Sequence, residues 1–235
     1  MLYRKVTLIT GSRKGIGRNL SEYYLEQGDI VIGCSRSETD LSQKDYHHFC
    51  LDVSNEKDVR QLFSEIRKKF GRLDVLINNA GAASLNHILL TPIETVNKLM
   101  STNFIGTFLF SREAVKLMQK NKNGRIVNFS TVAVPLNLEG EAIYASSKSA
   151  VEQLTKVMAK EVGPLGITVN AVGPTPVDTD LIKTVPANKI NELLSQQAIK
   201  RKGTFEDIRN VIDFLVKKES DFITGQIIYL GGVMK

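Results

Sequence analysis

Cysteine and histidine are scarce in this 235-residue chain, which contains two cysteines and three histidines. Cys34 and Cys50 are too few for a disulfide framework, and they lack the CxxC spacing of many metal and redox sites. His47, His48 and His87 form no metal-ligand pattern with neighbouring cysteines or carboxylates. We therefore expect both cysteines to be buried, reduced thiols, the two adjacent histidines to lie at the surface or at a strand edge, and no metal site.

Long hydrophobic runs are also missing. No stretch approaches the roughly 20 apolar residues of a transmembrane helix, and the N-terminus lacks the long apolar region and cleavage site of a signal peptide. The formal net charge of +6 is spread along the chain, without the basic stripe and interleaved aromatics typical of nucleic-acid binding. These features predict a cytoplasmic protein with neither a membrane nor a nucleic-acid partner.

The chain has no Ser/Pro-rich linker, low-complexity segment or internal repeat. Hydrophobic residues make up 42% and charged residues 24% of it, values that are ordinary for a globular protein with a sizeable core. An α/β fold commonly fills this length as one domain. We therefore expect residues 1–235 to form a single domain.

Apolar runs of strand length alternate with helical patterns from one end of the chain to the other. The strand-like runs are Val6–Thr10, Ile30–Cys34, Val75–Asn78, Arg125–Phe129 and Thr168–Val172. The clearest helix has apolar residues from Val59 to Phe70, ends at Gly71, and is capped in this interpretation by Asp52 or Ser54. Apolar strands that are each followed by a helix predict a doubly wound, Rossmann-type α/β fold, with a parallel sheet of about seven strands and helices on both faces.

A glycine-rich turn follows the first run and leads directly into a helical pattern. Glycines permit a tight strand-to-helix turn, and they let a phosphate approach backbone N–H groups at the positive end of the helix. The alternative is a purely structural turn, which would not require three glycines. The residues predicted to bind a dinucleotide here are Gly11, Ser12, Arg13, Lys14, Gly15, Ile16 and Gly17.

The second run ends without the acidic residue that Rossmann proteins preferring NAD usually carry about 20 residues after the glycines. It continues instead as Ser35-Arg36-Ser37. Arg36 can meet a 2′-phosphate, and Lys14 is a second cation nearby, which favours NADPH or NADP over NADH electrostatically. The alternative is that both side chains are solvated surface cations.

Tyr144 and Lys148 are four residues apart, so their side chains project from one face of a predicted helix that runs towards Glu161. The pKa of a free tyrosine is about 10, and a nearby ammonium group lowers it by favouring the phenolate. The pair therefore predicts a proton-handling site, in which the phenol donates a proton to a carbonyl oxygen in the reducing direction.

Further motifs follow one another in order along the chain. They are Thr10–Gly17, Asp52-Val53, Asn78-Asn79-Ala80-Gly81, Asn103, Tyr144-x-x-x-Lys148, residues 169–172, Pro174, Thr179 and residues 223–226. Together they resemble the short-chain dehydrogenase/reductase family over essentially the whole chain. The resemblance implies an NAD(P)-dependent oxidoreductase that acts on CH–OH or C=O groups and assembles as a homodimer or homotetramer. The further cofactor-binding residues that it implies are Asp52, Val53, Asn79, Ala80, Gly81, Tyr144, Lys148, Pro174, Val177 and Thr179.

The same resemblance implies the catalytic residues Asn103, Thr131, Tyr144 and Lys148. In the family the lysine also holds the nicotinamide ribose, and the asparagine supports a water relay. The family's usual serine falls on Thr131, thirteen positions before Tyr144, and Ser130 is the alternative. Adjacent strand residues point to opposite faces, so only one of these two hydroxyls should reach the substrate.

The chain departs from the family pattern at two further places. The usual Pro-Gly is Pro174-Thr175, and the usual Asp-Gly-Gly is Leu230-Gly231-Gly232. These changes leave the expected fold intact, but they leave open the geometry on the nicotinamide side and the shape of the substrate pocket.

Substrate is expected between residues 132–143 and the segment after Thr179. The first wall is largely apolar, with Val132, Val134, Pro135, Leu136 and Leu138. Leu181, Ile182, Val185 and Pro186 and the helical stretch up to Gln196 have the pattern of a mobile lid. Basic residues in or near this lid either attract an acidic partner, such as an acyl-carrier protein, coenzyme A or a nucleotide-linked sugar, or form its solvated face. They are Lys183, Lys189, Lys200, Arg201 and Lys202.

The expected function is NADPH-dependent reduction of a ketone to a secondary alcohol, or the reverse, with a carrier-linked 3-oxoacyl thioester as one candidate substrate. One alternative is a dehydrogenase of a sugar or another small alcohol. An alternative of another class is a non-catalytic dinucleotide-binding sensor or subunit.

Overall fold

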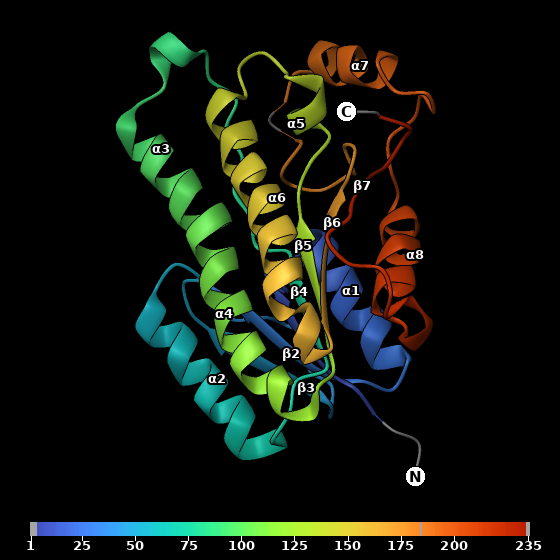
Figure 1. Ribbon diagram of the computed structural model, residues 1–235. Helices are drawn as coiled ribbons and strands as arrows, with labels where there is room; N and C mark the ends of the chain where they lie inside the picture. Colours follow the sequence, from blue (N-terminus) through green and yellow to red (C-terminus); the bar gives the residue numbers. More distant parts are fainter. Residues whose placement is uncertain (1–3, 184, 234–235) are drawn as a thin grey trace.

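A computed structural model describes residues 4–183 and 185–233. In this part of the chain the strands form one seven-stranded sheet in the order β3-β2-β1-β4-β5-β6-β7, with every pairing parallel (Figure 1). The bounds are β1 Val6–Thr10, β2 Ile30–Ser35, β3 Tyr46–Cys50, β4 Val75–Asn78, β5 Gly124–Phe129, β6 Ile167–Gly173 and β7 Ile227–Tyr229. The predicted doubly wound fold is confirmed. Because the winding reverses between β1 and β4, ligands are expected beyond the carboxyl ends of these strands.

Helices cover both faces of the sheet (Figure 1). The α-helices are α1 Gly15–Glu26, α2 Glu56–Phe70, α3 Ile93–Leu99, α4 Gly106–Met118, α5 Ala133–Leu136, α6 Ala142–Val162, α7 Ala187–Ser195 and α8 Phe205–Val216. Single turns of other helix types are η1 Ile88–Leu90, η2 Met100–Ile105, η3 Gln119–Asn121, η4 Gly163–Leu165 and η5 Lys218–Ser220. Helices α2, α4 and α6 pack on one face, α1 and α8 pack on the other, and α7 lies at the carboxyl-end edge.

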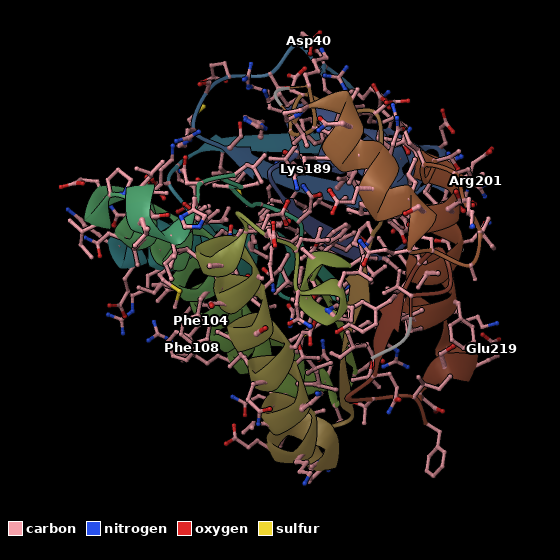
Figure 2. All side chains as sticks on the ribbon, turned by 90° about the horizontal axis from the view of Figure 1, so that it is seen from above. Asp40, Phe104, Phe108, Lys189, Arg201 and Glu219 are labelled. Carbon is pink, nitrogen blue, oxygen red and sulfur yellow. The ribbon has the colours of Figure 1, made fainter. Side chains whose placement is uncertain are left out.

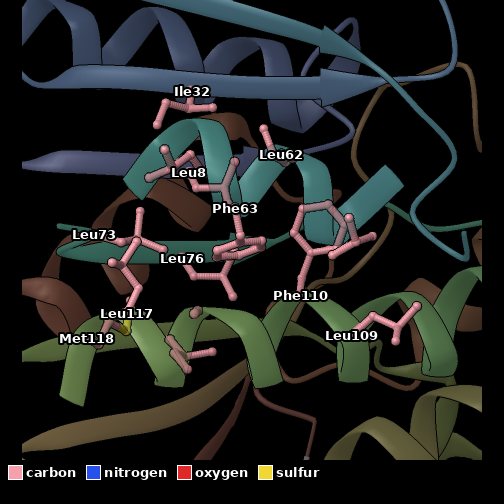
Figure 3. Close-up of a cluster of buried hydrophobic side chains, with 14 of the residues drawn as sticks. Leu8, Ile32, Leu62, Phe63, Leu73, Leu76, Leu109, Phe110, Leu117 and Met118 are labelled. Carbon is pink, nitrogen blue, oxygen red and sulfur yellow. The ribbon is translucent and has the colours of Figure 1, made fainter. Parts of the chain in front are cut away.

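Each face of the sheet has its own hydrophobic core. Leu8 and Ile9 are neighbours in β1, yet Leu8 packs in the core under α2, α4 and α6 whereas Ile9 packs in the core under α1 and α8. In the first core the Phe63 ring of α2 meets the Phe110 ring of α4 edge-on, with 5.8 Å between centroids (Figure 3). Two buried cores hold the strand ends, and hence the cleft beyond them, on a rigid support.

The helix predicted from the apolar residues between Val59 and Phe70 is present as α2, but its cap is neither Asp52 nor Ser54. The Asn55 side chain accepts hydrogen bonds from the amides of Lys57 (3.0 Å) and Asp58 (3.3 Å), so Asn55 is the N-cap. Asp52 instead accepts from the amide and hydroxyl of Ser54. The predicted end at Gly71 is confirmed, because that residue takes the left-handed conformation with φ 69°.

Strand β3 lies at one edge of the sheet, where the two adjacent histidines were predicted to lie. The prediction for the cysteines was half wrong, because Cys34 is buried whereas Cys50, the last residue of this edge strand, is exposed. Burial raises the pKa of the Cys34 thiol to about 12. Within residues 4–183 and 185–233 no helix is long and apolar enough to cross a bilayer, and no cluster of side chains is arranged to hold a metal ion.

Candidate active site

A cleft of about 430 Å³ opens beyond the carboxyl ends of the strands. The predicted site residues that line it are Gly11, Arg13, Lys14, Gly15, Ile16, Arg36, Asp52, Val53, Asn79, Ala80, Gly81, Thr131, Tyr144, Lys148, Pro174, Val177 and Thr179. Ser12, Gly17 and Asn103 were predicted too, but they are buried behind the wall. Residues from 11 to 179 thus meet in one space, because the carboxyl ends of parallel strands share one edge of the sheet.

The glycine-rich turn is fixed from behind by the loop after β4. Asn79 Nδ2 donates to the carbonyl of Thr10 at 2.8 Å, and the amide of Ala80 donates to the Thr10 hydroxyl at 2.9 Å. Gly11 and Gly15 have φ values of 69° and 60°, which side chains rarely tolerate. The turn is therefore held in a conformation that depends on its glycines.

Helix α1 begins at this turn with no side chain capping its first amides, and no acidic residue lies in its first turn. The first N–H groups of a helix need partners from outside the helix and form the positive end of its dipole. Here they lie at the cleft, beside Arg13 and Lys14. This arrangement suits a phosphate group.

Arg36, Lys14 and Asp180 line the part of the cleft beyond β1 and β2. Arg36 follows β2 with an exposed side chain. The Lys14 ammonium forms a 2.8 Å ion pair with Asp180. Lys14 thus lines the same cleft as Arg36 and is also tied to the segment that leads into α7.

Tyr144 and Lys148 lie in the first two turns of α6, as predicted. Lys148 is 4% exposed, and its Nζ donates to the backbone carbonyl of Phe129 at 2.8 Å. A Cβ atom on Gly81 would lie 3.5 Å from the same Nζ, so the loop after β4 passes close to the ammonium group. Lys148 therefore joins the ends of β4 and β5 to α6.

The expectation that the ammonium lowers the pKa of Tyr144 was wrong for the protein as it stands. Burial raises the pKa of Tyr144 to about 12, against an opposing effect of a hydrogen bond with the Thr131 side chain. Burial lowers the pKa of Lys148 to about 8. Burial shifts both pKa values towards the neutral forms because the enclosed cleft solvates charge poorly, but a pKa of about 8 leaves Lys148 mostly protonated at neutral pH. Tyr144 accordingly carries its proton at neutral pH.

Asn103 lies in a π-helical turn between α3 and α4 and is fully buried. Its Oδ1 accepts from the amide of Ala82 at 2.8 Å, while its Nδ2 donates to the Ala82 carbonyl and the Ser147 hydroxyl, each at 2.9 Å. The Ser147 hydroxyl in turn donates to the carbonyl of Tyr144 at 2.7 Å. Such π-turns often mark functional sites, and this one links the loop after β4 to the turn of α6 that carries Tyr144.

The two candidate hydroxyls after β5 point in different directions. Thr131 lines the cleft, where it lies close enough to Tyr144 to affect its pKa, and its hydroxyl accepts from the amide of Ala133 at 3.2 Å. The Ser130 hydroxyl donates to the carboxylate of Glu152, which is buried in α6 and also accepts from the Tyr229 hydroxyl at 2.6 Å. The geometry favours Thr131 as the hydroxyl that meets a substrate.

Replacing Thr131 with Ala should lower kcat at least about tenfold, because it removes a hydrogen bond beside the reacting oxygen. Ser130→Ala should lower kcat less and reduce stability instead, since it leaves buried Glu152 without one donor. Steady-state kinetics and urea unfolding of both variants measure the two effects. The opposite order in kcat would assign the active-site hydroxyl to Ser130.

The substrate end of the cleft lies between the loop before α6 and helix α7. Val132, Leu138, Ile190 and Leu193 give it apolar walls, and α7 crosses it with Lys189 on the cleft side (Figure 2). Four of the five basic residues noted in the sequence form ion pairs with carboxylates, which weakens the case for an acidic docking partner. The pairs are Lys183–Asp180, Lys189–Glu192, Arg201–Asp207 and Lys202–Asp178.

Sequence reasoning missed Glu141, which is the residue before α6 and lines the cleft. Burial raises the pKa of this carboxyl to about 7, and its charge in turn raises the pKa of Tyr144. Its place three residues before Tyr144, in a predicted helix start, was the only signal available. At the substrate end Glu141 can accept hydrogen bonds from polar groups of a ligand.

Comparisons with known proteins agree with this geometry. Residues 11–233 match the protein family described as enoyl-(acyl carrier protein) reductase. The chain is 33% identical over 236 residues to the 3-oxoacyl-[acyl-carrier-protein] reductase of Vibrio cholerae serotype O1, covering 98% of this chain and 97% of that protein.

Solved structures resemble the chain along nearly its whole length. The ligand-free aldohexose dehydrogenase of Thermoplasma acidophilum has a TM-score of 0.89 at 30% identity, covering 99% of this chain and 94% of that chain. ElxO with NADP bound has a TM-score of 0.89 at 33% identity, covering 97% of each chain.

Fold, site and similarities together define the class of this protein, an NAD(P)-dependent oxidoreductase. Within that class the chain belongs to the short-chain dehydrogenase/reductase family, as its ordered motifs predicted.

Proposed function

We propose that the protein reduces a ketone to a secondary alcohol with NADPH, or catalyses the reverse oxidation. The observation that carries the proposal is that Tyr144 lines the cleft together with Thr131, one helical turn from buried Lys148. Two hydroxyls that line the same cleft can together hold a carbonyl oxygen, and one of them can protonate it.

The bound nicotinamide supplies the hydride. Tyr144 donates its proton to the carbonyl oxygen, which becomes the alcohol hydroxyl, while Thr131 hydrogen-bonds the same oxygen. Lys148 has three N–H donors, one of which the carbonyl of Phe129 takes. The others are available to the nicotinamide ribose and to the phenol. Asn103 acts as a positioning residue, because its contacts hold the loop after β4 and the start of α6.

Two features of the chain and one relative support a bound dinucleotide, and the last two of these points support a 2′-phosphate on it. The first amides of α1 lack a side-chain cap, which suits the pyrophosphate. Arg36 lines the cleft, and no acidic residue stands at the end of β2. The relative ElxO binds NADP.

Arg36→Ala should remove most of the preference for NADPH, weakening NADPH binding by about 10- to 100-fold and NADH binding by less than about twofold. The reason is that a guanidinium–phosphate pair is a charge-assisted hydrogen bond that NADH cannot form. Fluorescence titration with both dinucleotides measures the change, and Arg60→Ala on the exposed face of α2 is the control. Equal affinities in the wild type would refute the assignment of NADPH.

Two substrate classes remain as proposals. The apolar walls and the similarity to a 3-oxoacyl-[acyl-carrier-protein] reductase support an acyl thioester, which a carrier would present. The carboxyl of Glu141 and the similarity to an aldohexose dehydrogenase support a hydroxylated substrate such as a sugar. We favour the acyl thioester, because most side chains at the substrate end are apolar.

A panel of ketones, 3-oxoacyl thioesters, enoyl thioesters and, in reverse, aldoses tests the proposal by following the absorbance of reduced nicotinamide. Turnover of 3-oxoacyl thioesters or simple ketones supports it. Turnover of enoyl thioesters alone would place the chemistry at a C=C bond instead. Dinucleotide binding without any turnover would support the non-catalytic sensor or subunit.

We further propose that the chain acts in the cytoplasm as one catalytic domain, residues 1–235, and as a homodimer or homotetramer. The single sheet of the described residues supports one domain. Exposed apolar side chains on the outer side of η2, α4 and α6 support assembly; they are Ile105, Phe108 and Val157. Phe108 lies at the periphery in the view from above (Figure 2).

A further inference from the structure

A chain of hydrogen bonds runs from the glycine-rich turn to the loop after β2. The Ser12 hydroxyl contacts the Tyr46 hydroxyl at 2.9 Å, and the Tyr46 hydroxyl contacts His48 Nδ1 at 2.9 Å. On the other side of the ring, His48 Nε2 lies 3.1 Å from both the Ser35 hydroxyl and the carbonyl of Ser37. The imidazole of His48 thus links the glycine-rich turn to the loop after β2, and residues of both segments line the cleft.

The donors and acceptors in this network follow from its fixed points. The carbonyl of Ser37 can only accept, and it already receives the Ser35 hydroxyl at 2.6 Å. A hydrogen on His48 Nε2 is therefore required, and in the neutral imidazole this leaves Nδ1 as the acceptor for the Tyr46 hydroxyl. The Tyr46 oxygen then accepts from Ser12. With a neutral imidazole, each hydroxyl and each ring nitrogen of the network has a partner in one arrangement of donors and acceptors.

The glycine at position 33 of β2 leaves the space in which this network forms. A Cβ atom on Gly33 of β2 would lie 2.1 Å from the Tyr46 hydroxyl oxygen and 2.3 Å from that of Ser12. Any other residue at position 33 would separate the two. Ser12 is fully buried and Tyr46 is 7% exposed, so loss of either bond would leave a polar group without water.

Arg36 stands between the two residues that His48 binds. Fixing both neighbours restricts the backbone on either side of Arg36 and so limits the directions in which its guanidinium can project. A group that is held in its binding geometry before the ligand arrives loses less entropy on binding. The contacts of His48 with Ser35 and Ser37 therefore favour the binding conformation of Arg36, although His48 itself does not contact the ligand.

We propose that His48 is the positioning residue for Arg36 and thereby sets the preference for a dinucleotide that carries a 2′-phosphate. The inference rests on the proposed use of NADPH. It assigns a role to the hydrogen-bond network that includes the buried Ser12 hydroxyl. It also explains why Ser12, although part of the glycine-rich turn, does not line the cleft.

The neighbouring residue provides a matched control. His47 lies on the opposite face of β3, where its ring packs 5.4 Å from the Phe70 ring and within 3.2 Å of Lys69 Nζ on α2. His47→Phe changes the same strand and the same residue type without touching the loop at Arg36. His48→Gln can retain a donor towards the Ser37 carbonyl, whereas His48→Phe removes both ring nitrogens.

Two measurements test the proposal. Titration should show NADPH binding about tenfold weaker in His48→Phe and NADH binding within about twofold of the wild type, because only the 2′-phosphate needs Arg36. His48→Gln should keep most of the NADPH affinity, and His47→Phe should keep all of it. Hydrogen exchange of the protein without dinucleotide should be faster at residues 36–45 in His48→Phe than in His47→Phe.

The two readouts separate this inference from the proposed function. Equal NADPH and NADH affinities in the wild type would overturn the assignment of NADPH and the preference with it, while faster exchange would still reveal the contact that holds the loop. Unchanged exchange in His48→Phe would overturn the positioning role. Equal loss of both affinities in that variant would reduce His48 to a structural residue.

Discussion

Tyr144→Phe should lower turnover by about 10²- to 10⁴-fold, while the affinity for the dinucleotide stays within about twofold of the wild type. The phenol is the group proposed to protonate the carbonyl oxygen, and removal of a general acid has an effect of this size. The ring itself is kept, so the packing at the start of α6 should not change. Steady-state kinetics and fluorescence titration on the same preparation measure both quantities.

A matched control for this variant is Tyr23→Phe. The Tyr23 hydroxyl donates to the carboxylate of Asp213. Tyr23 lies on α1 and does not line the cleft. Its removal should leave turnover unchanged. If Tyr144→Phe retained more than about a third of the wild-type kcat, Tyr144 would not be the proton donor.

The pKa of Tyr144 is a property of the site that the sequence could not predict. Spacing places Tyr144 and Lys148 one turn apart on a helix, and that placement was right. Their pKa values depend on burial, and burial comes from segments far away in the sequence, such as the loop at Gly81 and the end of β5. The sequence therefore predicted the pair but gave the wrong direction for the pKa of Tyr144.

The prediction of the strands was limited in the same way, because a local pattern identifies a strand only where the strand is buried on both faces. The five runs predicted as strands are β1, β2, β4, β5 and β6, whose residues are mostly buried on both faces. Strand β3, with the sequence Tyr-His-His-Phe-Cys, lies at an edge and is only partly buried, so it lacks a continuous apolar run. Strand β7 has three residues, which is too short for a pattern.

The distinction between Ser130 and Thr131 needed a residue that no local pattern could supply. Glu152 lies twenty-two positions beyond Ser130, and it draws that hydroxyl away from the cleft. Thr175, a departure from the family pattern, is likewise buried against Gln197, twenty-two positions away, and a Cβ atom on Gly231 would lie 2.7 Å from Gln197 Oε1. The two departures at 175 and 230–232 thus meet at one side chain, which accounts for how the fold accommodates both.

Gly17→Ala should destabilise the protein by about 3 kcal/mol and weaken dinucleotide binding by more than about tenfold. A Cβ atom at this position would lie 2.3 Å from the carbonyl oxygen of Gly11 and 2.5 Å from Asn79 Nδ2. Neither can move away cheaply, because one is backbone and the other is hydrogen-bonded to Thr10. Overpacking of this kind outweighs the gain in helix propensity from glycine to alanine, which is about 1 kcal/mol.

The affinity should fall with the stability because Gly17 lies under the turn that is proposed to bind the phosphates. Moving α1 away from Gly11 also moves the uncapped amides at its start. Urea unfolding and dinucleotide titration measure the two losses. Arg60→Ala on the exposed face of α2 is the control, since it changes a helix surface that does not line the cleft. A Gly17→Ala protein as stable as this control would mean that α1 can shift without cost, and the rigid turn on which the phosphate site depends would not exist.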